Sequence, residues 1–315
     1  MSKYIKPNSL SVGYNNGGQG FFDVLNSYRE YIHSYFFSFD YMYESKLLNQ
    51  KKYKDVFRKC NTFDIPANVL INNYEISDNW RHIIEDALSY DINLTSVTVV
   101  SPEIASNIRK YYPQLEIHSS VRVIDRYVFN PYKIFEIFDG LVDVINMSVA
   151  HQHHDIKFQE KCKSKNIKTK FILNETCLLG MQYNYKNFDG FNNETCTHNN
   201  VTSSCQKMCE NVVNKYPWLD ISRTRLYKES LPYMNHDIYK LATRLNYIYN
   251  RGIADILDYW TSDNSTKFIG VKRLISINDK NRKTFEDYIK FRNECSCDCN
   301  TCRKCEYFYN KLIDN

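Results

Sequence analysis

The sequence predicts an α/β protein, a (β/α)8 barrel of the TIM type, and two observations support this class. Eight short apolar runs alternate with stretches of helical periodicity, which is the pattern of a parallel sheet whose strands are joined by helices. The runs are short and mainly apolar, as expected for strands that are covered on both faces. An open doubly wound sheet is the alternative, but no G-x-G-x-x-G motif follows the first run.

The strand candidates are recognised by their short length and their apolar residues. A barrel of this kind requires eight of them, each followed by a helical connection. In chain order they are Ser9–Gly13, Ser34–Phe39, Ala67–Asn72, Ser96–Val100, Leu115–Ser119, Leu141–Asn146, Lys170–Asn174 and Asp237–Ala242.

Helices are expected between these strands. The clearest start is Ser101-Pro102, because a serine can cap the first turn and a proline is preorganised at the first helical position. That helix should end near Tyr112. The other predicted helices are Phe21–Ile32, Asn79–Tyr90, His153–Lys165 and Thr243–Trp260.

The alternation breaks once, between the seventh and eighth strands. About 60 residues separate these strands, far more than a normal connection. Long ordered insertions at the carboxyl end of barrel strands are usually functional. We therefore expect a barrel over residues 1–262, including an insertion at 175–235, and a cysteine-rich C-terminal extension over 263–315.

Composition and charge indicate a cytoplasmic protein without a membrane segment. The N-terminal sequence MSKYIKPNSL has no apolar signal-peptide core, and no stretch has the roughly 18 apolar residues of a membrane span. The eleven cysteines are an odd number, so metal binding is favoured over a disulfide framework. A net charge of +5 is compatible with either a small-molecule or an RNA substrate.

Nine of the eleven cysteines lie in two clusters. The first has the spacing Cys-x18-Cys-x8-Cys-x3-Cys inside the insertion. Four thiolates suit a [4Fe–4S] cluster or a zinc ion, while four reduced, buried cysteines are the alternative. The ligand candidates of this first cluster are Cys177, Cys196, Cys205 and Cys209.

The second cluster indicates a possible further metal site between two short helices. It packs five cysteines into eleven residues, and its close spacing resembles that of iron–sulfur and zinc knuckle sites. A redox-active tail is the alternative. The flanking helices are expected over Phe285–Phe291 and Tyr307–Leu312, and the cysteines are Cys295, Cys297, Cys299, Cys302 and Cys305.

Polar residues lie where the predicted strands end, and barrel active sites form at the carboxyl ends of the strands. His118 and Glu175 are candidates for proton transfer, and Arg244 is a candidate anchor for an anion. Asn174 completes the candidate catalytic set. The alternative is that these residues are polar only because they lie at the junctions between strands and loops.

Four segments resemble the collagenase-like peptidase family of unknown catalytic type. Lys170–Cys177 (KFILNETC) matches the strand that leads to a first cysteine, and Cys205-x3-Cys209 matches the pair that closes the insertion. Within Arg225–Arg244, the sequence YKLATR fits the family's strand of the form hydrophobic-Lys-hydrophobic-x-x-Arg. Glu116–Ser120 (EIHSS) is similar to the family's hydrophobic-His-x-Ser strand end.

The resemblance implies a barrel that holds an iron–sulfur cluster on four cysteines, together with an electron-donor or related partner protein. Members of this family include factors for oxygen-independent hydroxylation of RNA bases and quinone precursors, and some were described as proteases. Cys177, Cys205 and Cys209 match its ligands. The family's further cysteine is absent from Met181–Tyr185, so the resemblance leaves Cys196 as the substitute fourth ligand.

The resulting hypothesis is an iron–sulfur-dependent enzyme that carries out a hydroxylation or another redox modification of a polar or nucleotide-like substrate at the barrel mouth. Two alternatives remain open. One is a peptidase or other hydrolase, although no H-E-x-x-H or G-x-S-x-G motif is present. The other is a non-catalytic zinc protein that binds a partner.

The iron–sulfur hypothesis predicts that protein purified without oxygen contains iron and absorbs visible light. The expected content is about four iron atoms per chain if the first cluster is complete. Iron analysis and an ultraviolet–visible spectrum measure this directly. A colourless, iron-free protein that binds zinc stoichiometrically would contradict the hypothesis.

Overall fold

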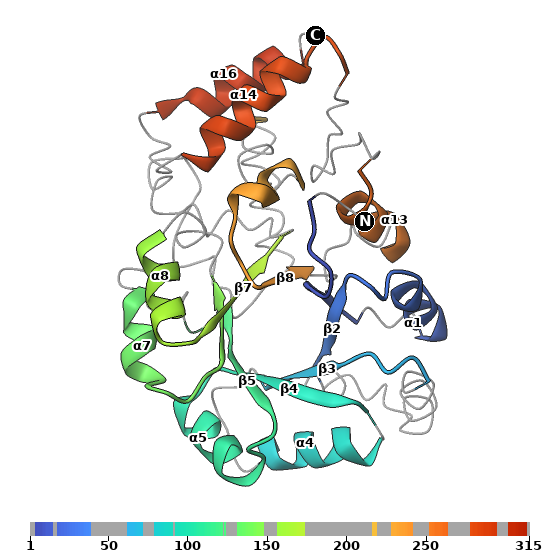
Figure 1. Ribbon diagram of the computed structural model, residues 1–315, viewed down its shortest axis with the longest axis vertical. Coiled ribbons are helices and arrows are strands. Elements are labelled where there is room, and N and C mark those ends of the chain that lie inside the picture. Colours follow the sequence, from blue (N-terminus) through green and yellow to red (C-terminus); the bar gives the residue numbers. More distant parts are fainter. Residues whose placement is uncertain are drawn as a thin grey trace.

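Eight parallel strands close into a barrel in the order of the chain, and the last strand pairs with the first (Figure 1). The protein is represented by a computed structural model. It describes residues 4–14, 18–38, 62–71, 79–90, 92–121, 123, 131–147, 156–173, 216–218, 228–241, 252–263, 278–294 and 302–313. The closed ring of eight parallel strands confirms the predicted barrel. Its strands are β1 (Leu10–Gly13), β2 (Ile32–Phe37), β3 (Ala67–Ile71), β4 (Leu94–Val99), β5 (Glu116–Ser119), β6 (Val144–Met147), β7 (Lys168–Ile172) and β8 (Ile238–Leu241).

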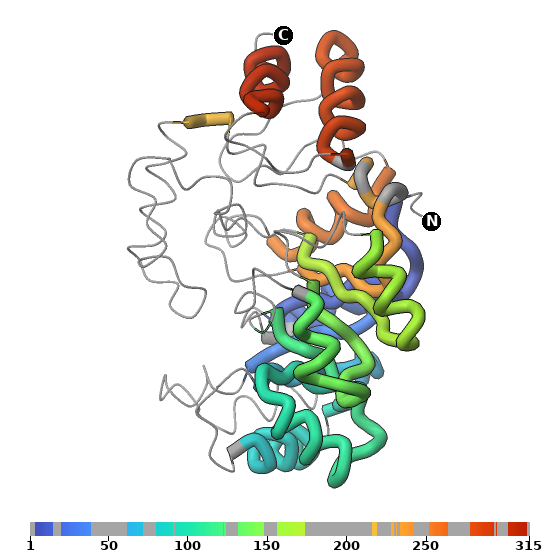
Figure 2. Tube along the Cα trace, turned by 90° about the vertical axis from the view of Figure 1, so that its left-hand side faces the viewer, coloured from blue at the N-terminus to red at the C-terminus, as the bar shows by residue number. Residues whose placement is uncertain are grey.

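The helices are α1 (Gly18–Ser27), α4 (Asn79–Ser89), α5 (Pro102–Tyr111), η1 (Pro131–Lys133) with α7 (Ile134–Ile137), α8 (Ile156–Ser164), η3 (Lys228–Tyr233), α13 (Ile253–Thr261), α14 (Arg282–Asn293) and α16 (Lys304–Ile313). Helices α1, α4, α5, α7, α8 and α13 lie around the outside of the barrel, whereas α14 and α16 lie beyond it at the top of Figures 1 and 2. No helix in the described ranges has the length and apolar character needed to cross a membrane.

The predicted helix start at Ser101-Pro102 is confirmed. The Ser101 side chain accepts a hydrogen bond from the backbone N–H of Ile104, and Pro102 occupies the first turn of α5. The two helices predicted near the C-terminus are also present, as α14 and α16, which pack against each other. Helix α7 was not predicted. The domain boundary after residue 262 and the structure of the insertion remain predictions.

The sixth strand starts later than predicted. Leu141 belongs to the turn after α7, where its N–H donates to the carbonyl of Phe138. The strand begins only at Val144. Asp143, the residue before it, accepts a hydrogen bond on its carboxylate from the N–H of Ile117 in β5. The prediction was wrong because apolar residues alone do not distinguish a turn that packs on the core from a strand.

The apolar core lies between the outer face of the barrel and the surrounding helices. Tyr35 on β2 meets Phe22 on α1 edge to face, with ring centroids 5.1 Å apart. On another side of the barrel, Phe158 of α8 contacts Phe135 of α7 at a centroid distance of 5.0 Å. Each such buried ring contributes a few kcal/mol through the area it removes from water. Folding therefore depends on the outer face, which leaves the lumen available for polar residues.

Two aspartates fix the starts of alternate strands. The Asp143 carboxylate accepts hydrogen bonds from the N–H of Ile117 and from Arg109 Nη2, both at 2.7 Å. Asp237 accepts from the N–H of Thr169 at 2.8 Å in the same way, just before β8. Each carboxylate satisfies a backbone donor near the beginning of the preceding odd-numbered strand. These contacts hold β5 and β7, which carry most of the charged groups of the lumen.

Replacing Asp143 with alanine should lower the free energy of unfolding by about 1–3 kcal/mol, because the buried N–H of Ile117 loses its acceptor and Arg109 loses its charge partner. Asp143→Asn should cost less, since its amide oxygen can still accept. Urea denaturation measures both values. The control is Asp287→Ala, which breaks the exposed ion pair with Lys283 and should change stability by no more than about 0.5 kcal/mol. Equal losses for Asp143→Ala and Asp287→Ala would contradict this role.

Candidate functional site

Polar side chains dominate two adjacent layers of the barrel lumen, while Leu70, Val144, Ile172 and Ile238 share the inward face of their strands. Alternate residues of a strand face the same side, and the pairing of neighbouring strands arranges the inward residues in layers. Barrels usually fill these layers with Val, Ile and Leu. Here the odd-numbered strands contribute Ser11, Asn68, His118 and Lys170, and the even-numbered strands contribute Phe36, Thr98, Asn146 and Lys240.

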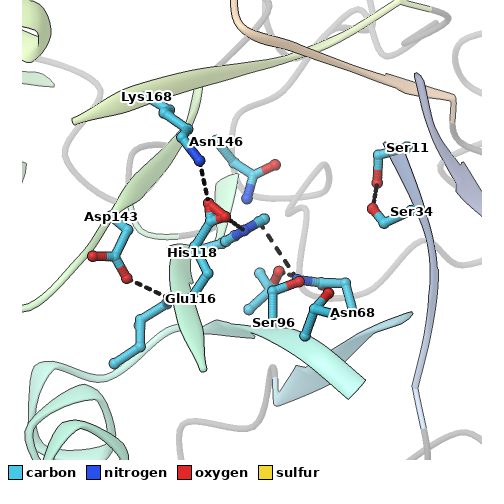
Figure 3. Close-up of polar contacts among 12 residues, drawn as sticks. Ser11, Ser34, Asn68, Ser96, Glu116, His118, Asp143, Asn146 and Lys168 are labelled. Carbon is cyan, nitrogen blue, oxygen red and sulfur yellow. Dashed lines mark hydrogen bonds and ion pairs between the residues drawn. The ribbon is translucent and has the colours of Figure 1, made fainter. Parts of the chain in front are cut away.

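Asn68 is the centre of a neutral hydrogen-bond network on one side of the lumen (Figure 3). Its Nδ2 donates to Ser96 Oγ at 2.7 Å, and its Oδ1 accepts from Thr98 Oγ1 at 2.7 Å. Ser11 and Ser34 pair through their hydroxyls at 3.0 Å. These groups satisfy one another, so this side is a rigid, uncharged wall.

Charged groups gather on the opposite side, beginning at the amino ends of β5 and β7. The Glu116 carboxylate lies 3.1 Å from Lys168 Nζ and 3.7 Å from His118 Nε2. Asn68 Nδ2 lies 3.4 Å from His118 Nδ1. An amide N–H can only donate, so His118 Nδ1 is the acceptor and its proton is on Nε2, facing Glu116. His118 thus lies between the neutral network and the carboxylate, although its Nε2 has no hydrogen-bond partner among the described residues.

The charges of this group are set by burial and by its neighbours. Burial lowers the pKa of His118 to about 4, and Lys170 acts in the same direction while Glu116 opposes them. Burial alone would raise the pKa of Glu116, but His118 and Lys168 outweigh it and lower that pKa to about 2. At neutral pH the imidazole is therefore uncharged and the carboxylate is ionised.

Two lysines on adjacent strands enter the lumen from β7 and β8. Lys170 is 1% exposed and Lys240 is 7% exposed. Their Nζ atoms lie 5.9 Å and 4.3 Å, respectively, from the centroid of the Phe36 ring. Within the described part of the chain, Lys170 Nζ has neither a hydrogen bond nor a carboxylate within ion-pair distance. Burial lowers the pKa of Lys170 to about 7, with Glu116 opposing the shift.

Asn146 adds a buried acceptor beside these lysines. Its Nδ2 donates to the carbonyl of Ser119 at 2.6 Å. Its Oδ1 is buried and has no hydrogen-bond partner among the described residues. Buried polar atoms are normally paired, so this oxygen is available to a ligand that offers a donor in the same layer as Lys240.

The structure describes only part of the predicted site. His118 lies inside the barrel rather than at its rim, fully buried. The remaining catalytic candidates, Asn174, Glu175 and Arg244, lie outside the described residues, as do the cofactor candidates Cys177, Cys196, Cys205 and Cys209. Of the predicted catalytic and cofactor residues in the barrel and its insertion, the structure therefore places only His118.

The second cysteine cluster is described at two positions. Cys305 is buried, with Arg292 Nη1 3.9 Å from its sulfur, and Cys302 is partly exposed. Cys295, Cys297 and Cys299 lie outside the described residues. Among the residues that the structure describes, no group of three or more His, Cys, Asp or Glu side chains is arranged to hold a metal ion.

Sequence reasoning gave no functional role to Lys170, Lys240 or Asn68. A signal was present, because each interrupts an apolar strand, as in KFIL, IYKL and ANVL. No model of a known protein family matches the chain, and no curated protein was found to be similar to it. The lumen is therefore interpreted from its own chemistry.

The uncharged state of His118 predicts a dependence of stability on pH. Between its ordinary value of 6.5 and about 4, the unfolded chain binds the proton and the folded state does not. The free energy of unfolding therefore falls as the pH is lowered through this window, by up to about 3 kcal/mol for this residue. His33 and His236, whose pKa values burial also lowers to about 4, add to the fall.

The His118→Gln variant should show a shallower loss of stability between pH 6.5 and 4.5, measured by urea denaturation at several pH values. The control is His82→Gln at an exposed position on α4, which should change stability by no more than about 0.5 kcal/mol at any pH. A slope unchanged by His118→Gln would show that the folded protein does not keep this imidazole uncharged.

Proposed function

We propose that the protein is an enzyme that binds a small anionic substrate in the barrel lumen, near the carboxyl ends of β7 and β8. The supporting observation is the pair of buried lysines around Phe36. Burial of an ammonium group costs several kcal/mol unless it is paired, and Lys170 has no ion pair among the described residues. A cost of this size at the centre of a fold is typical of a functional site.

The position on the barrel supports an anionic ligand. Strands seven and eight of such barrels frequently provide a phosphate site at their carboxyl ends. Lys240 pairs in register with Ile172, two residues beyond Lys170, so it is the lysine closer to that end. We assign Lys240 to the substrate's carboxylate or phosphate and Asn146 Oδ1 to a hydroxyl or N–H of the substrate.

His118 has a positioning role in this proposal. Its Nδ1 is occupied by Asn68 and its Nε2 faces Glu116, so the imidazole lies between the neutral wall and the carboxylate. The Glu116 charge is partly cancelled by Lys168. The amino-end part of the lumen therefore has little net charge, and Lys170 and Lys240 lie nearer the carboxyl ends of the strands, where we place the anion.

The type of reaction is proposed from the sequence alone. The chain leaves the carboxyl end of β7 and reaches Cys177 a few residues later. An iron–sulfur cluster on Cys177, Cys196, Cys205 and Cys209 would supply electron transfer to a redox modification. The thiolate donor set suits such a cluster. Iron analysis tests this part of the proposal independently of substrate binding.

Small anions should raise the melting temperature of the protein, and the effect should depend on Lys240. The probes are phosphate, glyoxylate, pyruvate and adenosine monophosphate, with chloride at the same ionic strength as a reference. Lys240→Met should weaken the affinity for the best probe about 10-fold or more, because a charge-assisted hydrogen bond is lost. Thermal-shift titration measures this.

The matched control is Lys163→Met on the exposed surface of α8, which removes the same charge and should leave the affinity unchanged. Isothermal titration calorimetry of the best probe gives a second measure of binding that does not depend on thermal unfolding. If no probe binds, or if both variants lose affinity equally, the proposal of an anion site in the lumen is wrong.

A further inference from the structure

We infer that Lys170 is an amine nucleophile that forms an imine with an aldehyde or ketone group of the substrate, while Lys240 holds the substrate's anionic group. This inference rests on the proposed function and specifies its substrate class as an anionic carbonyl compound. It makes Lys170 a catalytic residue and leaves Lys240 as a binding residue. The two amines then have different roles although they share one aromatic neighbour.

The surroundings of Lys170 favour a free amine. The residue is 1% exposed, and its Nζ has no hydrogen bond within the described ranges. An ammonium group in such a place loses its hydration and gains no carboxylate contact in return. Its pKa of about 7 follows from this burial, so about half of the side chains carry an uncharged, nucleophilic nitrogen near neutral pH.

The other charged groups around Lys170 do not reverse this tendency. Glu116 is the anion that favours the ammonium form, but Lys168 lies 3.1 Å from its carboxylate and cancels part of its field. His33 and His118 are uncharged at neutral pH because burial lowers the pKa of each to about 4. Lys240 is a further cation on the neighbouring strand and cannot stabilise a second positive charge.

Lys240 is the less suitable nucleophile of the two. Its Nζ lies 4.3 Å from the Phe36 centroid, whereas that of Lys170 lies 5.9 Å away. The face of an aromatic ring stabilises a cation, and the attraction grows at short distance. The ring therefore gives Lys240 the closer cation–π contact, which suits a residue that binds an anion, and has less influence on Lys170.

The proposed step is balanced without any oxidant or reductant. The lone pair of the neutral Nζ forms a bond to the carbonyl carbon, the C=O π bond breaks, and one Nζ proton passes to the oxygen to give a neutral carbinolamine. The second Nζ proton passes to the hydroxyl group as the C–O bond breaks, so that water leaves and the C=N bond forms. The products are the imine and one water molecule. Protonation of the imine withdraws electrons from the adjacent carbon, which permits carbon–carbon cleavage, condensation or decarboxylation.

Reductive trapping tests the inference on the full-length protein. Glyoxylate and pyridoxal 5′-phosphate serve as anionic carbonyl probes, with sodium cyanoborohydride to reduce the imine to a stable amine. Peptide mapping by mass spectrometry should find one main adduct, on Lys170, with half-maximal labelling near pH 7. Surface lysines, which ordinarily titrate at about pH 10.4, should be labelled far less at that pH.

Variants and the binding experiment separate the possible outcomes. Lys170→Met should remove the adduct, and Lys163→Met should retain it. Because the site is mapped on the unsubstituted protein, the result does not depend on whether Lys170→Met folds. Adducts only on Lys240 or on surface lysines, or no adduct with either probe, would overturn the inference. If a probe still binds in a Lys240-dependent way without modifying Lys170, the anion site stands and the imine is wrong.

Discussion

The cost of placing ammonium groups inside a closed barrel is the constraint on which the rest of this structure depends. A lysine in the lumen cannot reach bulk water by extending its side chain, as a surface lysine can. Its charge must be balanced by neighbours, removed by loss of the proton, or neutralised by a ligand. At Lys170 the first solution is only partial, because Glu116 is shared with Lys168 and His118. In the proposed function, loss of the proton activates Lys170 and the bound anion provides the third solution.

Apolar packing on the outer face of the barrel compensates for the cost of burying ammonium groups in the lumen. Residues such as Val97, Ile117 and Phe171 point away from the lumen and are fully buried beneath the helices. The hydrophobic contribution of a barrel scales with the area buried on that face, so a polar lumen can be tolerated. Asp143 and Asp237 pin the starts of β5 and β7, the strands that carry His118 and Lys170. A rigid exterior therefore holds the polar groups in fixed positions, as a preorganised site requires.

The number and order of the strands could be predicted from the sequence because each strand is an apolar run separated from the next by helical periodicity. The direction of many side chains is also indicated, because residues such as Ser11 and Thr98 lie between apolar neighbours along their strands. In β7 the pattern is ambiguous, because Thr169 and Lys170 are both polar while Phe171 and Ile172 are both apolar. From the sequence of β7 alone, the Lys170 side chain could have faced either the lumen or the outside of the barrel. Only the register with β6 and β8 places it opposite Asn146 and Ile238. His118 was selected as a rim residue because it lies near the end of its predicted strand, although its side chain is buried inside the barrel.

The lumen divides into a neutral half and a charged half, and this division specifies where a substrate would react. Ser11, Ser34, Asn68, Ser96 and Thr98 come from β1 to β4 and are satisfied by one another, so they have little to offer a ligand. Glu116, Asn146, Lys170 and Lys240 come from β5 to β8, and the Oδ1 of Asn146 is without a partner among the described residues. A ligand gains most by contacting the second half, where its anionic group offsets an existing charge. In the proposed reaction the carbonyl group of the substrate would face β7 and Lys170, away from the neutral wall.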